Sequence, residues 1–126
     1  MYLLDTHALL WFLFNDEQLS ERARNIIINN KGRVFASIIS LWESAIKIRI
    51  NKLNFKYNPN DIMLLSRKES ITILNISVVQ INETINLPLI HRDPFDRLLI
   101  AQAKVEDMTL VTCDRYIPQY PIRTVW

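Results

Sequence analysis

The sequence predicts an α/β protein in which a central, mostly parallel sheet lies between two layers of helices. Short apolar segments rich in β-branched residues recur along the chain, as in strands that are buried on both faces of a parallel sheet. Segments with helical periodicity separate them, and this alternation is typical of a three-layer α/β/α domain. The length of 126 residues suits about one domain, so residues 1–126 are expected to form a single domain.

Five segments are predicted to be strands. Four are short and mostly apolar, and the closing segment is a candidate edge strand. In chain order they are YLL (2–4), VFASII (34–39), ITILNI (71–76), TLVTC (109–113) and IRTVW (122–126).

The helices are predicted from apolar spacing and from capping residues. Ser20 opens one helix, in which Ala23, Ile26 and Ile27 share a face, and the segment from Asn30 to Gly32 ends it. Asn58, followed by Pro59, opens another. The helices are expected at 7–14, 20–30, 40–50 (opening at Ser40), 58–70, 77–85 and 94–106.

The composition is that of an ordinary globular chain. Hydrophobic residues make up 49% and charged residues 22%. The longest apolar stretch, ALLWFLF, is too short to span a bilayer, and it lacks the flanks of a signal peptide, so neither a membrane protein nor export is expected. The lone Cys113 excludes an internal disulfide, fits a reducing cytoplasm, and is expected to be a small core residue. A net charge of +2 permits nucleic acid binding without requiring it.

Four acidic residues follow the predicted strands. Asp5 and Asp114 come directly after the first and fourth strands, and Glu43 and Asp96 each lie one turn into a helix. Ligands of open parallel sheets bind at the carboxyl ends of the strands, so these side chains are expected to converge. Clustered carboxylates repel one another unless a cation neutralises them, and Mg²⁺ or Mn²⁺ suits such oxygen ligands.

Each acid also has a local explanation. Asp93 and Asp96 could form a capping box at the start of the last helix, and Ser40 with Glu43 fits the same S-x-x-E pattern. The acids after the first and fourth strands could each be a turn or cap residue. Four such coincidences at strand ends are harder to accept than one shared site.

Four blocks of the sequence resemble, in order and spacing, the PIN-domain ribonucleases, and in particular the VapC toxins of bacterial and archaeal toxin–antitoxin pairs. The blocks are MYLLDTHALLW, SIISLWESAIK, HRDPFDRLLIAQA and LVTCD, and the resemblance runs over essentially the whole chain. It implies a PIN-like fold, a Mg²⁺- or Mn²⁺-dependent endoribonuclease activity on RNA, a cognate VapB-like antitoxin that neutralises it, and a homodimer.

The resemblance also implies roles for individual residues. It assigns catalysis and metal binding to Asp5, Glu43, Asp96 and Asp114, with Asp93 as a further candidate ligand. Thr6 and Thr112 match the small hydroxyl residues beside the first and last acids and are candidates for substrate binding. The chain departs from the family pattern at Cys113, where a polar residue such as Asn is expected, and in the segment that follows Asp114.

Positive charge for a phosphate backbone is available near the acids. The run KIRINKLNFK follows the Glu43 region, and three arginines flank the last two acids. An ordinary solvated face is the competing interpretation of the run. The candidate phosphate contacts are Lys47, Arg97 and Arg115, with Arg49, Lys52, Lys56 and Arg92 also available.

Histidines and aromatic residues are less informative. His7 and His91 are expected to be structural or to support the acids, because neither has a partner at ligand spacing and hard cations prefer oxygen. Aromatic residues crowd two of the predicted helices, and the sequence does not divide them between the core and a groove for an antitoxin or a second copy. They are Trp11, Phe12, Phe14 and Trp42.

The sequence bears on three rival functions. A dinucleotide-binding fold is excluded because Gly32 is the only glycine and no Gly-rich phosphate loop exists. An aspartyl-phosphate receiver or phosphatase does not account for Glu43 one turn into a helix. A catalytically silent PIN-like module that binds RNA or a protein remains open.

Overall fold

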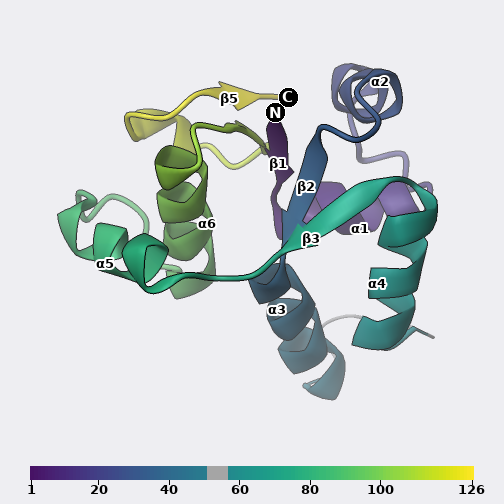
Figure 1. Ribbon diagram of the computed structural model, residues 1–126, viewed down its shortest axis with the longest axis horizontal. Coiled ribbons are helices and arrows are strands. Elements are labelled where there is room, and N and C mark those ends of the chain that lie inside the picture. The colour runs from purple at the N-terminus through teal and green to yellow at the C-terminus, as the bar shows by residue number, and fades with distance from the viewer. Residues whose placement is uncertain (51–56) are drawn as a thin grey trace.

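The computed structural model describes residues 1–50 and 57–126. The described residues form a five-stranded parallel sheet in the order β3-β2-β1-β4-β5 (Figure 1). The predicted α/β class is therefore confirmed, and the closing segment does supply an edge strand. The strands are β1 (Tyr2–Leu4), β2 (Val34–Ser37), β3 (Ile71–Leu74), β4 (Thr109–Val111) and β5 (Thr124–Val125).

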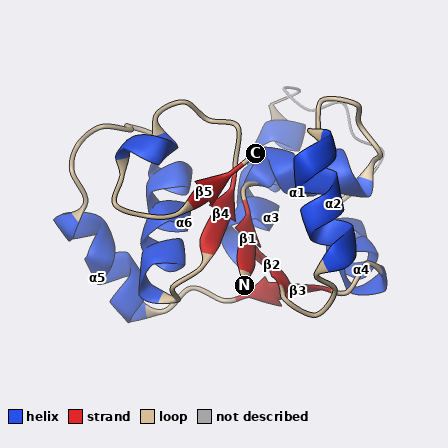
Figure 2. Cartoon of the chain, turned by 90° about the horizontal axis from the view of Figure 1, so that it is seen from above, coloured by secondary structure: helices blue, strands red, loops and turns tan. Residues whose placement is uncertain are grey.

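Helices cover both faces of the sheet. Seen from above, α5 and α6 lie on one side of the strands, and α1, α2 and α4 lie on the other (Figure 2). Across the described ranges, none of the helices combines the length and the apolar character needed to span a bilayer. The helices are α1 (Thr6–Leu13), α2 (Glu21–Asn29), α3 (Ile38–Arg49), α4 (Pro59–Lys68), α5 (Val78–Asn86) and α6 (Pro94–Val105), with a short 3₁₀ turn, η1 (Ile117–Gln119).

Two apolar cores form because successive strand residues point to opposite faces. Leu4 packs in one core with Leu9 of α1, and Leu3 packs in the other with Leu99 of α6. All four side chains are fully buried. Burial on both faces explains why the strands read as continuous apolar runs without an alternating polar face.

The start of α3 differs from the prediction. The strand was expected to continue to Ile39 and the helix to open at Ser40, but β2 ends at Ser37, which caps α3. The Ser37 side chain accepts a hydrogen bond of 3.2 Å from the backbone N–H of Ile39. The two isoleucines have the composition of a strand, but the capping serine before them starts the helix two residues earlier.

The strand order reverses between β1 and β4. The chain passes from β1 to β2 and β3 on one side, whereas β4 and β5 lie on the other side of β1. Such a reversal separates the connections that leave the two strands and opens a crevice at their carboxyl ends. Asp5 lies there, and its backbone N–H donates to the carbonyl of Val111, the last residue of β4 (3.1 Å).

Candidate active site

A cavity of about 280 Å³ opens beyond the carboxyl ends of β1 and β4. The structure brings all five predicted acidic residues to its wall, although they come from four separate parts of the sequence. The cavity is lined by Asp5, Thr6, His7, Trp11, Glu43, Lys47, Asp93, Asp96, Cys113 and Asp114.

Asp5 serves both as a helix cap and as part of the cavity wall. Its Oδ1 accepts a hydrogen bond of 2.7 Å from the backbone N–H of Ala8 at the start of α1. The residue is only 5% exposed. Burial raises the pKa of Asp5, and hydrogen bonds from the Thr112 side chain and from Ala8 only partly oppose this effect. A buried carboxylate with a raised pKa gains from a nearby cation.

Glu43 is held by two side chains. Thr6 Oγ1 donates to Glu43 Oε1 at 2.6 Å, and Lys47 Nζ lies 2.8 Å from Oε2. The capping-box interpretation of Ser40 and Glu43 is wrong, because Ser37 caps α3 and Ser40 lies inside the helix, 3.0 Å from Thr6 Oγ1. Thr6 is therefore engaged with the buried end of α3, and it also lines the cavity.

Asp93 caps α6, but Asp96 does not complete a capping box. Asp93 Oδ1 accepts from the backbone N–H of Phe95 at 2.8 Å. The backbone N–H of Asp93, which a capping box would direct to Asp96, instead donates to His91 Nδ1 at 3.1 Å. Burial and then the negative charge of Asp93 raise the pKa of Asp96 to about 7, against the influence of His91.

Asp114 sits in a different electrostatic environment. Its Oδ1 accepts backbone hydrogen bonds from Tyr116 (2.7 Å) and Ile117 (3.2 Å), and its own N–H donates to Thr112 Oγ1 (3.1 Å). Partial burial works against ionisation, but the bonds from Tyr116 and His91 outweigh it and lower the pKa of Asp114. The Thr112 hydroxyl thus contacts both strand-end acids and does not line the cavity within the described chain.

His91 lies between two of the acids. Its Nε2 is 3.0 Å from Asp96 Oδ2 and 3.1 Å from Asp114 Oδ2. From the sequence, His91 is expected at most to support the acids, because it has no partner at ligand spacing. The available signal was its position two residues before the cap residue Asp93, where a ring nitrogen can reach the backbone N–H of the cap.

The two arginines expected to contact phosphate make other contacts in the structure. The Arg97 guanidinium donates to the carbonyls of Thr84 (2.8 Å) and Pro88 (2.9 Å). These hydrogen bonds link α6 to the end of α5 and to the segment that follows it. Arg115 is exposed, and its guanidinium lies 4.8 Å from the centre of the Tyr116 ring. In the described part of the chain, neither arginine belongs to the cavity wall.

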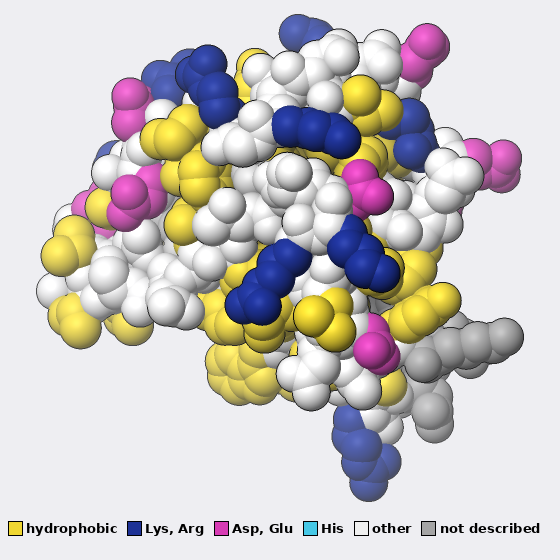
Figure 3. All heavy atoms as spheres, turned by 45° about the vertical axis from the view of Figure 1, so that its right-hand side comes forward, with side chains coloured by type: hydrophobic (Ala, Val, Ile, Leu, Met, Phe, Trp, Pro, Cys, Tyr) yellow, Lys and Arg dark blue, Asp and Glu magenta, His cyan; other side chains and the backbone are white. Residues whose placement is uncertain are grey.

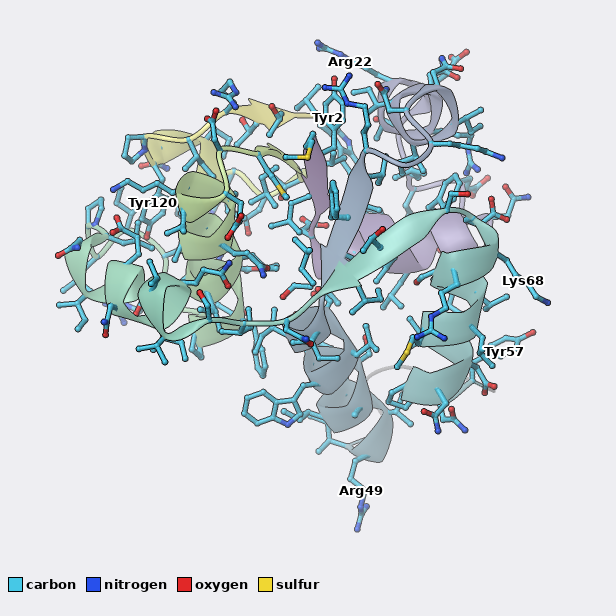
Figure 4. All side chains as sticks on the ribbon, viewed as in Figure 1. Tyr2, Arg22, Arg49, Tyr57, Lys68 and Tyr120 are labelled. Atoms are coloured by element: carbon cyan, nitrogen blue, oxygen red, sulfur yellow. The ribbon has the colours of Figure 1, made fainter. Side chains whose placement is uncertain are left out.

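The other basic residues of the described chain do not gather in one place. Arg49 and Arg92 are exposed, and Arg49 extends from the end of α3 away from the sheet (Figure 4). Lys52 and Lys56 lie outside the described residues. Figure 3 shows Lys and Arg side chains in separate groups over one face of the molecule, with hydrophobic side chains between them. Within the described residues, Lys47 is the basic side chain, other than histidine, that lines the cavity.

The structure divides the aromatic residues that the sequence left unassigned. Trp11, Phe12 and Phe14 are partly buried and pack against the core beneath α1. Trp42 is 60% exposed and contacts the Phe95 ring edge-on, with 5.4 Å between the ring centroids. Three of these residues therefore belong mainly to the core, and Trp42 lies on the surface.

The prediction that Cys113 is a core residue is wrong. Cys113 is exposed and lines the cavity. The strand was expected to run to Cys113, but β4 ends at Val111, so the next residues belong to the loop at the edge of the sheet.

The side chains at this site fit a hard divalent cation. Carboxylate oxygens dominate the wall, and burial raises the pKa of Asp5 and of Asp96. Ligand atoms of His91, Asp96 and Asp114 lie within 4.8 Å of one another. Lys47 is already paired with Glu43, so among the described residues it does not balance the charge of the other acids. Oxygen ligands with surplus negative charge suit Mg²⁺ or Mn²⁺.

Comparisons with known proteins agree on the fold. The PIN domain family model matches residues 2–122. No curated protein matches the chain.

Solved structures that resemble the chain include VapBC2 from Rickettsia felis bound to a DNA fragment from the promoter, with 18% identity and a TM-score of 0.70 over 98% of this chain and 96% of the other. FitAcB from Neisseria gonorrhoeae shows 18% identity and a TM-score of 0.67 over 100% and 97%. DNA-bound VapBC from Salmonella typhimurium shows 19% identity and a TM-score of 0.70 over 98% and 96%. At these identities the likeness concerns the fold.

Proposed function

The chain belongs to the PIN domain family, and from this membership we propose that it is a metal-dependent endoribonuclease that hydrolyses RNA phosphodiester bonds. We propose further that it acts in the cytoplasm as the toxin of a toxin–antitoxin pair. PIN domains are generally nucleases, so hydrolase activity is the part of this proposal that family membership supports most directly. The observation that carries it is the convergence of Asp5, Glu43, Asp96 and Asp114 on one cavity.

In this proposal Asp5, Asp96 and Asp114 hold Mg²⁺ or Mn²⁺, with Asp93 as a further ligand. The bound cation would lower the pKa of a water molecule and stabilise charge on the leaving oxygen. The surrounding hydrogen bonds support this assignment, because they keep the carboxylates in fixed orientations. Asp5 is fixed by Ala8, and Asp114 is fixed by backbone N–H groups of the following turn.

Glu43 would contact the cation or orient the attacking water. Its carboxylate accepts from Thr6 at one oxygen and pairs with Lys47 at the other. A carboxylate in this position can accept a proton from water. Glu43 is only 6% exposed, so it is presented to the cavity from a fixed position.

Substrate contacts would come from the rim of the cavity. The Lys47 side chain is 28% exposed, so it can contact an RNA phosphate while it remains near Glu43. Arg115 is exposed beside Asp114 and would bind a neighbouring phosphate. The choice of RNA over DNA rests on the resemblance to PIN-domain ribonucleases.

The proposed partner is a VapB-like antitoxin, and the proposed assembly includes a homodimer. Two of the similar structures are described as VapBC2 and VapBC bound to DNA. In this chain an exposed apolar stripe runs along α3 to its C-cap residue, formed by Trp42 (60% exposed), Ile46 (36%) and Ile50 (54%). Residues four apart share one face of a helix, so the stripe is a continuous surface for an apolar partner.

The nuclease proposal is tested with protein that has been purified under denaturing conditions and refolded, so that no bound partner remains. Wild type, Asp5→Asn and Asp107→Asn are incubated with single-stranded RNA and Mg²⁺, with EDTA in parallel. Asp107 is a matched control because its carboxylate is exposed and pairs with Arg123 away from the cavity.

We expect cleavage by wild type and Asp107→Asn in Mg²⁺, and none in EDTA or by Asp5→Asn. Equal cleavage by all three proteins would identify a contaminating nuclease. A folded wild type that binds RNA without cutting it would favour the silent binding module.

A further inference from the structure

We propose that His91 is a positioning residue that holds Asp96 and Asp114 together as a hydrogen-bond donor and is not itself a metal ligand. This inference rests on the proposed function, because it concerns two of the carboxylates that the nuclease would use. It is carried by the hydrogen bonds at the two ring nitrogens of His91.

The first ring nitrogen determines where the proton lies. His91 Nδ1 accepts a hydrogen bond of 3.1 Å from the backbone N–H of Asp93. A nitrogen that accepts a hydrogen bond carries no proton, so in the neutral ring the proton is on Nε2. The backbone at the start of α6 therefore selects the tautomer of His91.

The second ring nitrogen faces the acids. Nε2 lies 3.0 Å from Asp96 Oδ2 and 3.1 Å from Asp114 Oδ2, so one N–H group is shared between two carboxylates. A protonated nitrogen has no lone pair for a metal ion. The three side chains are close enough to surround a cation, but His91 enters this cluster as a donor.

The carboxylates keep their capacity to bind a cation. Each carboxylate oxygen has two lone pairs, so a hydrogen bond from His91 leaves room for a further interaction. Asp96 belongs to α6 and Asp114 to the loop after β4, so the two residues lie on different elements. In this proposal the imidazole ring between their carboxylates sets the distance from one carboxylate to the other.

Two tyrosines support His91, one through its backbone and one through its ring. The buried Tyr120 hydroxyl accepts from the backbone N–H groups of His91 (2.7 Å) and Ile90 (3.2 Å). Tyr120 lies beside α6 (Figure 4). The Tyr116 ring meets the imidazole edge-on, with an interplanar angle of 69° and 5.7 Å between the centroids. These contacts orient the His91 ring, and the ring in turn orients carboxylates that could bind a metal ion.

Nitrogen-15 NMR of the histidine side chains tests the tautomer directly. The chain has two histidines, so a His7→Gln variant identifies the His91 signals. We expect His91 to be protonated at Nε2 both without and with Mg²⁺. A neutral His91 that is protonated at Nδ1, or that moves its proton to Nδ1 when Mg²⁺ is added, would overturn the proposal and make His91 a ligand.

Calorimetric titration with Mg²⁺ tests the positioning role. We expect His91→Leu to lower the Mg²⁺ affinity by about tenfold or more, as loss of a supporting hydrogen bond to a metal ligand does. His91→Gln should restore most of the affinity. The amide nitrogen of glutamine is separated from Cβ by the same number of bonds as Nε2 of histidine, and it can donate a hydrogen bond to the carboxylates. Circular dichroism establishes that each variant is folded.

The outcomes separate this inference from the proposed function. Affinity in a folded His91→Leu equal to wild type, or in His91→Gln as low as in His91→Leu, would overturn the positioning role even if RNA is cut. If wild type binds Mg²⁺ and His91 behaves as expected but RNA is not cleaved, the nuclease proposal fails and the positioning role stands.

Discussion

The Thr6 hydroxyl donates a hydrogen bond of 2.6 Å to Glu43 Oε1, and both residues are buried. The bond joins α1, which follows the first strand, to α3, which follows the second. It keeps a carboxylate in a fixed orientation in a place that little solvent reaches.

Thr6→Val removes this bond with almost no change in side-chain shape. We expect the free energy of unfolding to fall by about 1–3 kcal/mol, because a buried acceptor loses its donor. Thr6→Ser keeps the hydroxyl and should retain most of the stability. Urea unfolding of the three proteins measures the difference, and equal stability of the Val and Ser variants would contradict the assigned role.

Asp96 should make stability depend on pH in the absence of divalent cations. Its pKa is about 7 in the folded protein against an ordinary value of 3.8, so between these values the folded state binds more protons than the unfolded state. Stability therefore falls as the pH rises from about 4 to about 7. The full shift corresponds to at most about 4 kcal/mol.

Asp96→Asn removes the charge that causes this loss. At pH 7.5 the variant should unfold at a temperature several degrees higher than wild type, and near pH 4 most of this difference should be gone, because Asp96 is then protonated in the folded state and about half protonated in the unfolded state. Thermal unfolding in EDTA at the two pH values measures this. A variant that is less stable than wild type at pH 7.5 would contradict the raised pKa.

Mg²⁺ should stabilise the fold at neutral pH, because it binds acids that come together only in the folded state. At a concentration of about one hundred times its dissociation constant, the expected gain is about 2.7 kcal/mol. Asp5→Asn should lose most of this gain, whereas Asp107→Asn should keep it. A shift in melting temperature of equal size in both variants would place the bound ion outside the cavity.

Lys47→Met should lower the affinity for RNA and have a smaller effect on the free energy of unfolding. The Michaelis constant for RNA should rise, and the slope of log affinity against log salt concentration should fall by about 1, as expected when one phosphate contact is lost. Lys47→Arg keeps the charge and should behave like wild type in the salt titration. An unchanged slope in Lys47→Met would show that Lys47 does not contact an RNA phosphate and only pairs with Glu43.

Trp42→Ala should affect partner binding more than stability. Trp42 is 60% exposed, and its ring contact with Phe95 limits the expected loss to about 1.5 kcal/mol at most. Leu9→Ala, at a fully buried position, should cost about 2–5 kcal/mol.

Co-purification with the antitoxin encoded beside the gene, and light scattering for the dimer, measure association. If Trp42→Ala forms both complexes as tightly as wild type, the stripe on α3 is not an interface.

Much of the fold could be predicted because its determinants are local in sequence. Apolar β-branched runs and helical spacing located β1 to β5 and α1 to α6, and the edge strand near the end of the chain was among them. Element ends were less accurate. The sequence predicts a helix that opens at Ser40, whereas Ser37 caps it in the packed structure.

The convergence of the acids also followed from the sequence, because parallel strands end at the same edge of a sheet. The sequence therefore predicts that Asp5, Glu43, Asp96 and Asp114 lie near one another. Their hydrogen bonds could not be placed in this way. The capping box that Asp93 and Asp96 offered as a local alternative does not form, because His91 accepts the backbone N–H that it requires.

The sequence by itself determined the order of strands and helices and the presence of acidic residues at the strand ends, since both follow from residue type and spacing. Only the tertiary structure decided which way long polar side chains turn. Arg97 reaches the carbonyls of Thr84 and Pro88, and His91 reaches the carboxylates of Asp96 and Asp114. The physical reason is that a rotatable side chain takes the direction in which other elements offer hydrogen-bond partners, and those partners exist only after the chain has packed.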